Sequence, residues 1–337
     1  MIKIVAELAQ GYEGKPEQTY LLLLAGARAG ADAVKLQLVY AEELCTSDYK
    51  DFKLFSTLEM PDEIWQGLAK SARELNVELH LDVFGLRSLA LAESIGAQAV
   101  KIHGTDMGNI GLLQAVAKTN VPTVLLGAGG AFASEIEQAV KLLPNKQVVV
   151  LLGFQGYPTL NDANQIARVR TVSDLYSNQP NVTVGFADHA SPGDVLSTAL
   201  AATALGAGAT VFEKHLTLGQ VMKLEDHEAA LNPDQFAEFA CALRDCSVAL
   251  GEANVGDDFG MSSSELGYRQ WTRKHVVARR PIKNEEVISP DAVVLKRTPS
   301  KDALTSLESV YGQRAMRDIE VDHSIAQVDV SNDGAQS

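Results

Sequence analysis

The chain has 337 residues, more than the roughly 250–300 at which a single hydrophobic core stops growing, so we expect one large and one small domain. Apolar residues make up 46% of the sequence and charged residues 21%, a composition typical of a globular protein that excludes wholesale disorder. The net charge of -14 disfavours nucleic acid and anionic membranes as partners.

The first apolar segment, residues 2–8, contains Lys3 and Glu7 and so lacks the uninterrupted apolar stretch of a secretion signal. No later segment reaches the roughly 18 apolar residues of a membrane span. The cysteines at 45, 241 and 246 form no CxxC pair, which favours reduced thiols over a disulfide framework or a zinc site. We therefore expect a cytoplasmic protein.

One pattern occurs three times along the chain, as AGARAGADAVKL (25–36), LAESIGAQAVKI (91–102) and ATALGAGATVFEK (202–214). In each copy a small-residue helix end is followed by glycine and then by a β-prone run. Glycine at that point is typical of a left-handed helix cap. Repeated helix-to-strand joints indicate βα units and a parallel sheet.

Eight short β-prone runs follow one another, at residues 2–8, 33–38, 78–84, 99–104, 123–129, 148–154, 183–189 and 209–215. Helical periodicity separates most of them, for example at 61–75 and 134–143, and a helix at 233–250 would complete the ring. We therefore predict a (β/α)8 TIM barrel over residues 1–250. A doubly wound open sheet is second choice, because no GxGxxG motif follows the first strand.

The C-terminal part differs in character. Residues 251–264 are rich in Gly, Ser and Asp and are interpreted as a linker. Residues 265–330 alternate short apolar segments with turns, which predicts a compact, mainly β domain, and residues 331–337 are expected to be a frayed tail. Residues 261–300 hold eight Lys/Arg against four Asp/Glu, which supports a domain boundary here.

Polar side chains are concentrated where the predicted strands end, and in this fold those ends form the active site. His189 and His215 end neighbouring strands, close enough for both imidazoles to bind one divalent ion. Glu213 and Asp226 would add oxygen ligands, which suits Mn²⁺ or Mg²⁺. The alternative is that each histidine only hydrogen-bonds a neighbouring loop.

Lys35 and Lys101 occupy corresponding positions in two copies of the repeat. A lysine at the inner end of a barrel strand binds an anionic substrate, forms a Schiff base, or pairs with an acid such as Glu7. We favour anion binding. The glycines at 127, 129 and 130 could present amide groups to a phosphate, although a tight turn explains them equally well.

These residues lie in segments that resemble the sialic acid synthase family, whose members make nonulosonic acids. The resemblance covers nearly the whole chain and rests on AELAQGYEG, GADAVKLQ, AVKI, GYPT, GFADH, FEKHLTL and EDHEAALNP. The segment VVARRPIKNEEVISPDAVVLKR is similar to the antifreeze-like (SAF) domain that follows the family's barrel.

The resemblance implies a condensation of phosphoenolpyruvate with an N-acylated aldehyde sugar, with release of phosphate. It implies that a metal on His189 and His215 polarises the aldehyde, and that Lys35 and Lys101 hold the donor. Glu7, Glu213 and Asp226 would be the catalytic acids and bases. The remaining substrate-binding positions would be Gln37, Asp82, Gln155, Tyr157, Asp188 and Arg297. Arg297 would reach the partner's site in a domain-swapped homodimer.

The sequence departs from the family pattern around the phosphate. Asp82 replaces a serine or threonine and would repel a phosphate unless a lysine or a metal intervenes. Hydroxyl or amide donors are also replaced at Leu126, Ala187 and Gln155. Two other readings therefore stay open: a metal-dependent aldolase or lyase acting on a pyruvate-like enolate without phosphoenolpyruvate, and a non-catalytic sugar-binding protein.

Overall fold

The computed structural model describes residues 2–194, 196–251 and 256–331, and the chain forms two compact units, Met1–Gly251 and Glu252–Ser337. Each unit is described by itself. Among the described residues, no helix is both long enough and apolar enough to cross a membrane.

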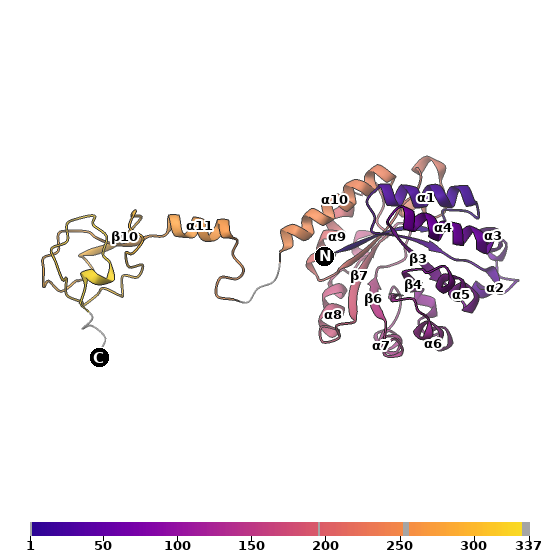
Figure 1. The fold of residues 1–337 in the computed structure, drawn as a ribbon, viewed down its shortest axis with the longest axis horizontal. Helices are drawn as coiled ribbons and strands as arrows, with labels where there is room; N and C mark the ends of the chain where they lie inside the picture. The colour runs from indigo at the N-terminus through magenta and orange to yellow at the C-terminus, as the bar shows by residue number, and fades with distance from the viewer. Residues whose placement is uncertain (1, 195, 252–255, 332–337) are drawn as a thin grey trace. The chain divides into compact units, whose positions relative to one another are not determined.

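The first unit is a closed parallel barrel in which each strand pairs with the next and β8 pairs with β1 (Figure 1). Its strands are β1 (Lys3–Ala9), β2 (Ala33–Gln37), β3 (Glu78–Val83), β4 (Ala99–Ile102), β5 (Thr123–Gly127), β6 (Gln147–Leu152), β7 (Val182–Asp188) and β8 (Val211–His215). Each end of every strand lies within two residues of the position predicted from the sequence. The predicted (β/α)8 barrel is confirmed.

Helices surround the strands (Figure 1). The described helices of this unit are α1 (Pro16–Arg28), α2 (Ala41–Leu44), α3 (Phe52–Leu58), α4 (Asp62–Glu74), α5 (Leu86–Ser94), α6 (Ile110–Lys118), α7 (Ala133–Leu142), α8 (Ala167–Leu175), α9 (Ser197–Gly206) and α10 (Pro233–Leu250). They pack through the apolar stripes visible in the sequence: α4 buries Trp65, Leu68, Ala69 and Ala72.

The three repeat glycines lie just after α1, α5 and α9, where each helix turns into the next strand. Gly30, Gly96 and Gly208 have φ angles of 84°, 74° and 108°, a backbone conformation that residues with a Cβ rarely adopt. The repeated motif therefore encodes the helix-to-strand joint, as its sequence predicts.

Side chains alternate between two environments along each strand. One set packs outward against the helices in the main hydrophobic core. The other set points into the barrel, where an apolar cluster contains Val5, Ala33, Ala99, Leu125, Val149, Leu151, Ala187 and Val211. Two residues further along several of these strands the inward positions become charged, and that change creates the candidate site.

The second unit contains α11 (Ser263–Thr272) and an antiparallel pair of strands, β9 (His275–Ala278) and β10 (Val293–Lys296). Its core includes Val276, Ile282, Ile288 and Val310. The small antiparallel sheet is consistent with the predicted small C-terminal domain, whose antifreeze-like identity stays a prediction.

Helix α11 is a correction to the sequence analysis, which assigned residues 251–264 to a linker and expected little helix after them. The Ser262 side chain caps the helix by accepting a hydrogen bond from Glu265 N at 3.1 Å. The serine run was read as linker composition, but it supplies a helix cap. Residues 252–255 of the predicted linker and 332–337 of the predicted tail lie outside the described residues.

Candidate active site

Five charged side chains form one buried layer inside the barrel, above its apolar cluster. They are Glu7 on β1, Lys35 on β2, Asp82 on β3, Lys101 on β4 and Glu213 on β8, and each is at most 4% exposed. Each lies two residues after an inward-facing position of its own strand, so the period of the strand places its side chain inside the barrel. We call these five residues the charged layer.

Lys35 lies at the centre of the charged layer. Its Nζ is 2.7 Å from Asp82 Oδ1 and 3.5 Å from Glu213 Oε2. It also contacts Glu7 Oε2. The Lys35–Glu7 pair that we considered from the sequence is therefore present, but as part of a larger network.

Lys101 joins the same network from β4. Its Nζ donates a hydrogen bond to Glu213 Oε1 at 2.9 Å, and it lies 3.8 Å from Asp82 Oδ2 and 3.9 Å from Glu7 Oε2. Three carboxyl groups thus share two ammonium groups. Such a cluster is costly to bury and is typical of a functional site.

The two glutamates have opposite protonation behaviour. Burial raises the pKa of Glu7 to about 8, because this effect outweighs the attraction of Lys35. Burial also acts on Glu213, but there Lys101 and Lys35 outweigh it and hold its pKa below the usual range. At neutral pH the layer therefore contains one carboxyl group able to donate a proton and one that remains an anion.

Three rings meet at the ends of β7 and β8. The His189 and His215 rings have centroids 5.2 Å apart, and Tyr157 packs edge-on against them at 5.1 and 5.4 Å. Burial lowers the pKa of His189 to about 4, and burial together with His189 lowers the pKa of His215. Both imidazoles are therefore neutral at pH 7, the form that can bind a metal.

The histidine pair suits a divalent ion as a partial ligand set. In the described part of the chain, neither imidazole hydrogen-bonds a neighbouring loop, and the buried His189 Nδ1 has no partner. Glu213 Oε2 is another buried oxygen without a hydrogen bond. No group of three or more potential ligands is arranged together among the described residues, so substrate or water oxygens would have to complete the coordination.

Other predicted residues contribute polar groups at the same end of the barrel. Gln37 accepts a hydrogen bond from Gln10 Nε2 at 2.7 Å. Gln155 Nε2 is 3.0 Å from His103 Nε2. Burial, together with the neighbouring Glu225 and Glu228, raises the pKa of Asp226 to about 6.

Asp188 lies outside the charged layer, although the sequence analysis put it in the substrate pocket. Its carboxylate accepts from Ala190 N at 2.8 Å and lies 3.3 Å from Lys214 Nζ. Because Ala187 faces the barrel interior, the next residue faces outward. Lys214 Nζ also donates a hydrogen bond to Ala190 O at 2.8 Å. Asp188 and Lys214 therefore hold the backbone after His189 from the outer side of the barrel.

Sequence reasoning missed the roles of Gln10 and Lys214. The signal for Lys214 was available, since it is one residue from His215 on the same strand and must therefore face the opposite way. Arg297 directly follows β10 in the second unit and is exposed. Its assignment to a partner's site stays a prediction.

Packing explains one of the glycines after β5. A Cβ on Gly129 would lie 2.2 Å from Gly153 O, so only glycine allows the loops after β5 and β6 to approach each other here. Whether amide groups of the glycine cluster bind a phosphate stays a prediction.

The fold and this site together define a (β/α)8-barrel protein whose polar site lies at the carboxyl ends of the strands. The model of the NeuB family matches residues 22–255, and the chain belongs to this family.

Two relatives and one solved structure illustrate the similarity. The chain is 27% identical to the spore coat polysaccharide biosynthesis protein SpsE of Bacillus subtilis, over 97% of this chain and 93% of SpsE. It is 24% identical to the N,N'-diacetyllegionaminic acid synthase of Legionella pneumophila, over 92% of this chain and 89% of that enzyme. The crystal structure of an N-acetylneuraminic acid synthetase from Leptospira borgpetersenii superposes with a TM-score of 0.71 at 24% identity, covering 80% and 91% of the two chains.

Proposed function

We propose that this protein is a nonulosonic acid synthase that condenses phosphoenolpyruvate with an N-acylated aldehyde sugar and releases phosphate. The observation that carries the proposal is the position of Lys35 and Lys101 in one buried layer with Glu7 and Glu213. Membership of the NeuB family and similarity to a relative named as a legionaminic acid synthase support it.

The enol donor would bind at the lysines. A carboxylate and a phosphate both need fixed positive charge, and Lys35 and Lys101 are the two cations of the charged layer. Because Asp82 already pairs with Lys35, the donor would have to displace that contact or share it. Asp82 would thus set how strongly the pocket attracts an anion.

The sugar would bind nearer to the loops, where Gln37, Gln155, Tyr157 and Asp226 supply hydrogen-bonding groups. Glu7, protonated at neutral pH, would donate a proton to the aldehyde oxygen as it gains negative charge. The enol carbon of the donor would bond to the aldehyde carbon, and water would then add to the carbon that carries the phosphate. Glu213, held as an anion, would accept a proton from this water, and cleavage of the bond between that carbon and the phosphate oxygen would release phosphate.

His189 and His215 would hold Mn²⁺ or Mg²⁺, which supplies Lewis-acid polarisation of the aldehyde when bound. Tyr157 packs against both rings and would fix their orientation. The family resemblance further leads us to propose a domain-swapped homodimer in which Arg297 of an antifreeze-like domain grips the sugar in the partner's barrel.

A second candidate, an aldolase or lyase that uses a pyruvate-like enolate without phosphate, is favoured by one observation. Asp82 Oδ1 is 2.7 Å from Lys35 Nζ, so a carboxylate of the protein itself already pairs with one of the two lysines that would bind a phosphate. A donor carrying less charge would compete less with it.

Phosphate release separates the two candidates. The full chain is incubated with Mn²⁺, phosphoenolpyruvate and one sugar at a time, either N-acetylmannosamine or a 2,4-diacetamido hexose. The inorganic phosphate that is released is measured. Sugar-dependent release that is abolished in His215→Ala, in a variant whose circular dichroism matches wild type, supports the synthase. Aldehyde-dependent consumption of pyruvate without phosphate release from phosphoenolpyruvate would support the aldolase instead.

A further inference from the structure

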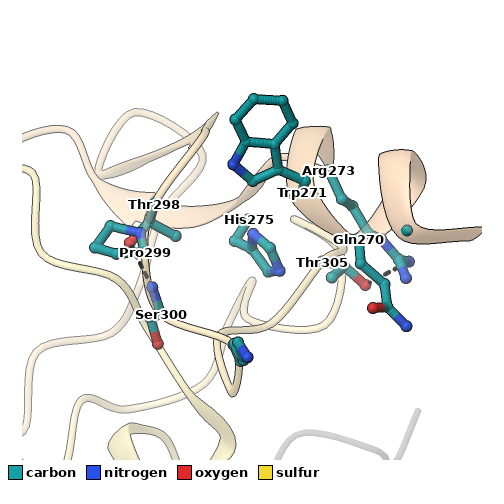
Figure 2. A pocket seen from close by; sticks show the side chains of 10 residues that line it. Gln270, Trp271, Arg273, His275, Thr298, Pro299, Ser300 and Thr305 are labelled. Atoms are coloured by element: carbon teal, nitrogen blue, oxygen red, sulfur yellow. Dashed lines mark hydrogen bonds between the residues drawn. The ribbon is translucent and has the colours of Figure 1, made fainter. Parts of the chain in front are cut away.

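The second unit contains a cavity of about 600 Å³ that the proposed function does not use. It lies between the C-terminal part of α11 and the loop that follows β10 (Figure 2). All of its lining residues belong to residues 267–305, within one compact unit. A volume of this size accommodates a sugar-sized ligand.

The cavity is cationic in a chain whose net charge is -14. Arg273 and Lys301 line it, and none of the described residues that line it is acidic. Arg273 Nη2 donates a hydrogen bond to Thr305 Oγ1 at 2.8 Å, which fixes the guanidinium group at the edge of the cavity. A guanidinium group held in this way binds carboxylate or phosphate oxygens with its remaining N–H groups.

His275 also lines the cavity and is 8% exposed. Its main chain is held in β9 opposite Lys296 of β10, which fixes where the side chain leaves the backbone. Figure 2 shows the ring in the middle of the pocket. Its Nδ1 is covered by protein atoms, so a ligand would contact the exposed part of the ring.

The remaining walls suit a hydroxylated ring. Trp271 is 84% exposed and offers a large apolar face, on which the C–H face of a sugar can pack. Thr298 and Ser300 lie on another side of the pocket and carry hydroxyl groups (Figure 2). The cavity thus combines a stacking surface, hydroxyl groups, an imidazole ring and two cations.

We propose that this cavity is a second ligand site, separate from the barrel, that binds an anionic sugar. The anionic group, either a carboxylate or a phosphate, lies against Arg273 and Lys301. The sugar ring packs on Trp271 and lies against the imidazole ring of His275. The proposal rests on residues of the second unit alone and does not depend on the activity of the barrel.

Fluorescence of the full chain tests the site, because its two tryptophans differ. Trp65 is 1% exposed within the barrel core, whereas Trp271 is 84% exposed at the cavity. N-acetylneuraminate, glucose 6-phosphate and inorganic phosphate are titrated, with N-acetylmannosamine as the neutral control. We expect a saturable change with at least one anionic sugar and none with the neutral sugar. The change should vanish in Trp271→Phe, while isothermal calorimetry still detects binding.

Variants locate the site. Arg273→Gln and Lys301→Gln should each raise the Kd at least tenfold, whereas Lys274→Gln, an equal charge change at an exposed residue that does not line the cavity, should leave it unchanged. His215→Ala should retain the binding, which separates this site from the barrel. Tighter binding of N-acetylneuraminate would identify the ligand as a carboxylated sugar, and tighter binding of glucose 6-phosphate would identify it as a sugar phosphate.

The outcomes against the proposal are equally definite. The proposal is overturned if neither anionic sugar binds saturably. It is also overturned if binding survives in both Arg273→Gln and Lys301→Gln. Loss of binding in His215→Ala would assign the ligand to the barrel. Inorganic phosphate binding as tightly as the sugars would overturn the role given to Trp271 and His275.

Discussion

Asp82 Oδ1 lies 2.7 Å from Lys35 Nζ, and Asp82 Oδ2 lies 3.8 Å from Lys101 Nζ. One aspartate therefore faces both cations to which an anionic donor would bind. Asp82→Asn removes this competing charge, so we expect the KM for phosphoenolpyruvate to fall about tenfold, or roughly 1.4 kcal/mol. Steady-state kinetics with phosphate detection measures it.

Asp174→Asn on α8 is the matched control, because it makes the same charge change at an exposed position of the barrel unit. Its KM should equal that of wild type. A higher KM in Asp82→Asn would mean that Asp82 helps to hold the donor and does not compete with it.

The second prediction concerns stability. Lys35 is fully buried and contacts three carboxyl groups, so Lys35→Met would leave them without their central cation and should cost about 3–5 kcal/mol. Lys101→Met should cost less, since among the described carboxyl groups only that of Glu213 lies within 3 Å of the Lys101 ammonium. Urea unfolding followed by Trp65 fluorescence, in a Trp271→Phe background, reports on the barrel.

A double variant provides the control. Adding Asp82→Asn to Lys35→Met removes one of the unpaired charges and should restore part of the lost stability. Equal losses for the two lysine variants, or no recovery in the double variant, would show that the charged layer is not electrostatically coupled in this way.

The architecture could be predicted from the sequence because local signals agree with it. Glycine caps, strand length and alternation place every barrel strand, and alternation alone puts Glu7, Lys35 and Glu213 inside. The sequence could not predict which of the charged side chains pair with one another inside the barrel. Lys101 pairs with Glu213, 112 residues away in the sequence, because the barrel closes between β8 and β1.

Two other differences have local physical reasons. Asp188 was assigned from its position at a strand end, but the direction of its side chain depends on whether Ala187 or Asp188 faces inward. The start of α11 was hidden because serine favours both linkers and helix caps. The hydrogen bonds from Glu265 N to Ser262 Oγ and from Leu266 N to Ser262 O show that Ser262 caps a helix.

The third prediction is a pH dependence. Burial raises the pKa of Glu7 from 4.5 to about 8, so the folded state binds a proton that the unfolded state has released between these values. The resulting stabilisation is complete below about pH 4.5 and is lost as the pH rises to about 8. The free energy of unfolding should therefore fall with rising pH in this window, by up to about 1.4 kcal/mol per pH unit.

Glu7→Gln cannot titrate and should lack this slope. Measuring both proteins between pH 6.5 and 8 isolates the effect, because other groups titrate alike in both and cancel in the difference. Curves that stay parallel over this range would contradict a raised pKa for Glu7.

The fourth prediction concerns Arg297, the exposed arginine after β10. If its guanidinium grips the sugar, Arg297→Ala should raise the KM for the sugar by tenfold or more and leave the KM for phosphoenolpyruvate within about twofold. Lys296→Ala, at the neighbouring residue, is the control for charge, because Lys296 pairs with Asp322 in its own unit. Equal effects on both substrates would remove the role assigned to Arg297.

Mixing two defective variants, assayed at a sugar concentration well below the wild-type KM, tests whether Arg297 acts across a homodimer. The His215→Ala chain has a defective barrel but an intact Arg297, whereas the Arg297→Ala chain has an intact barrel but lacks Arg297. After the subunits exchange at equal concentrations, half of the dimers contain one chain of each variant. If Arg297 completes the partner's barrel, each mixed dimer has one intact site, so about a quarter of wild-type activity should return. If Arg297 serves the barrel of its own chain, no site in any mixed dimer contains both groups, and the mixture should show only the mean activity of its two components.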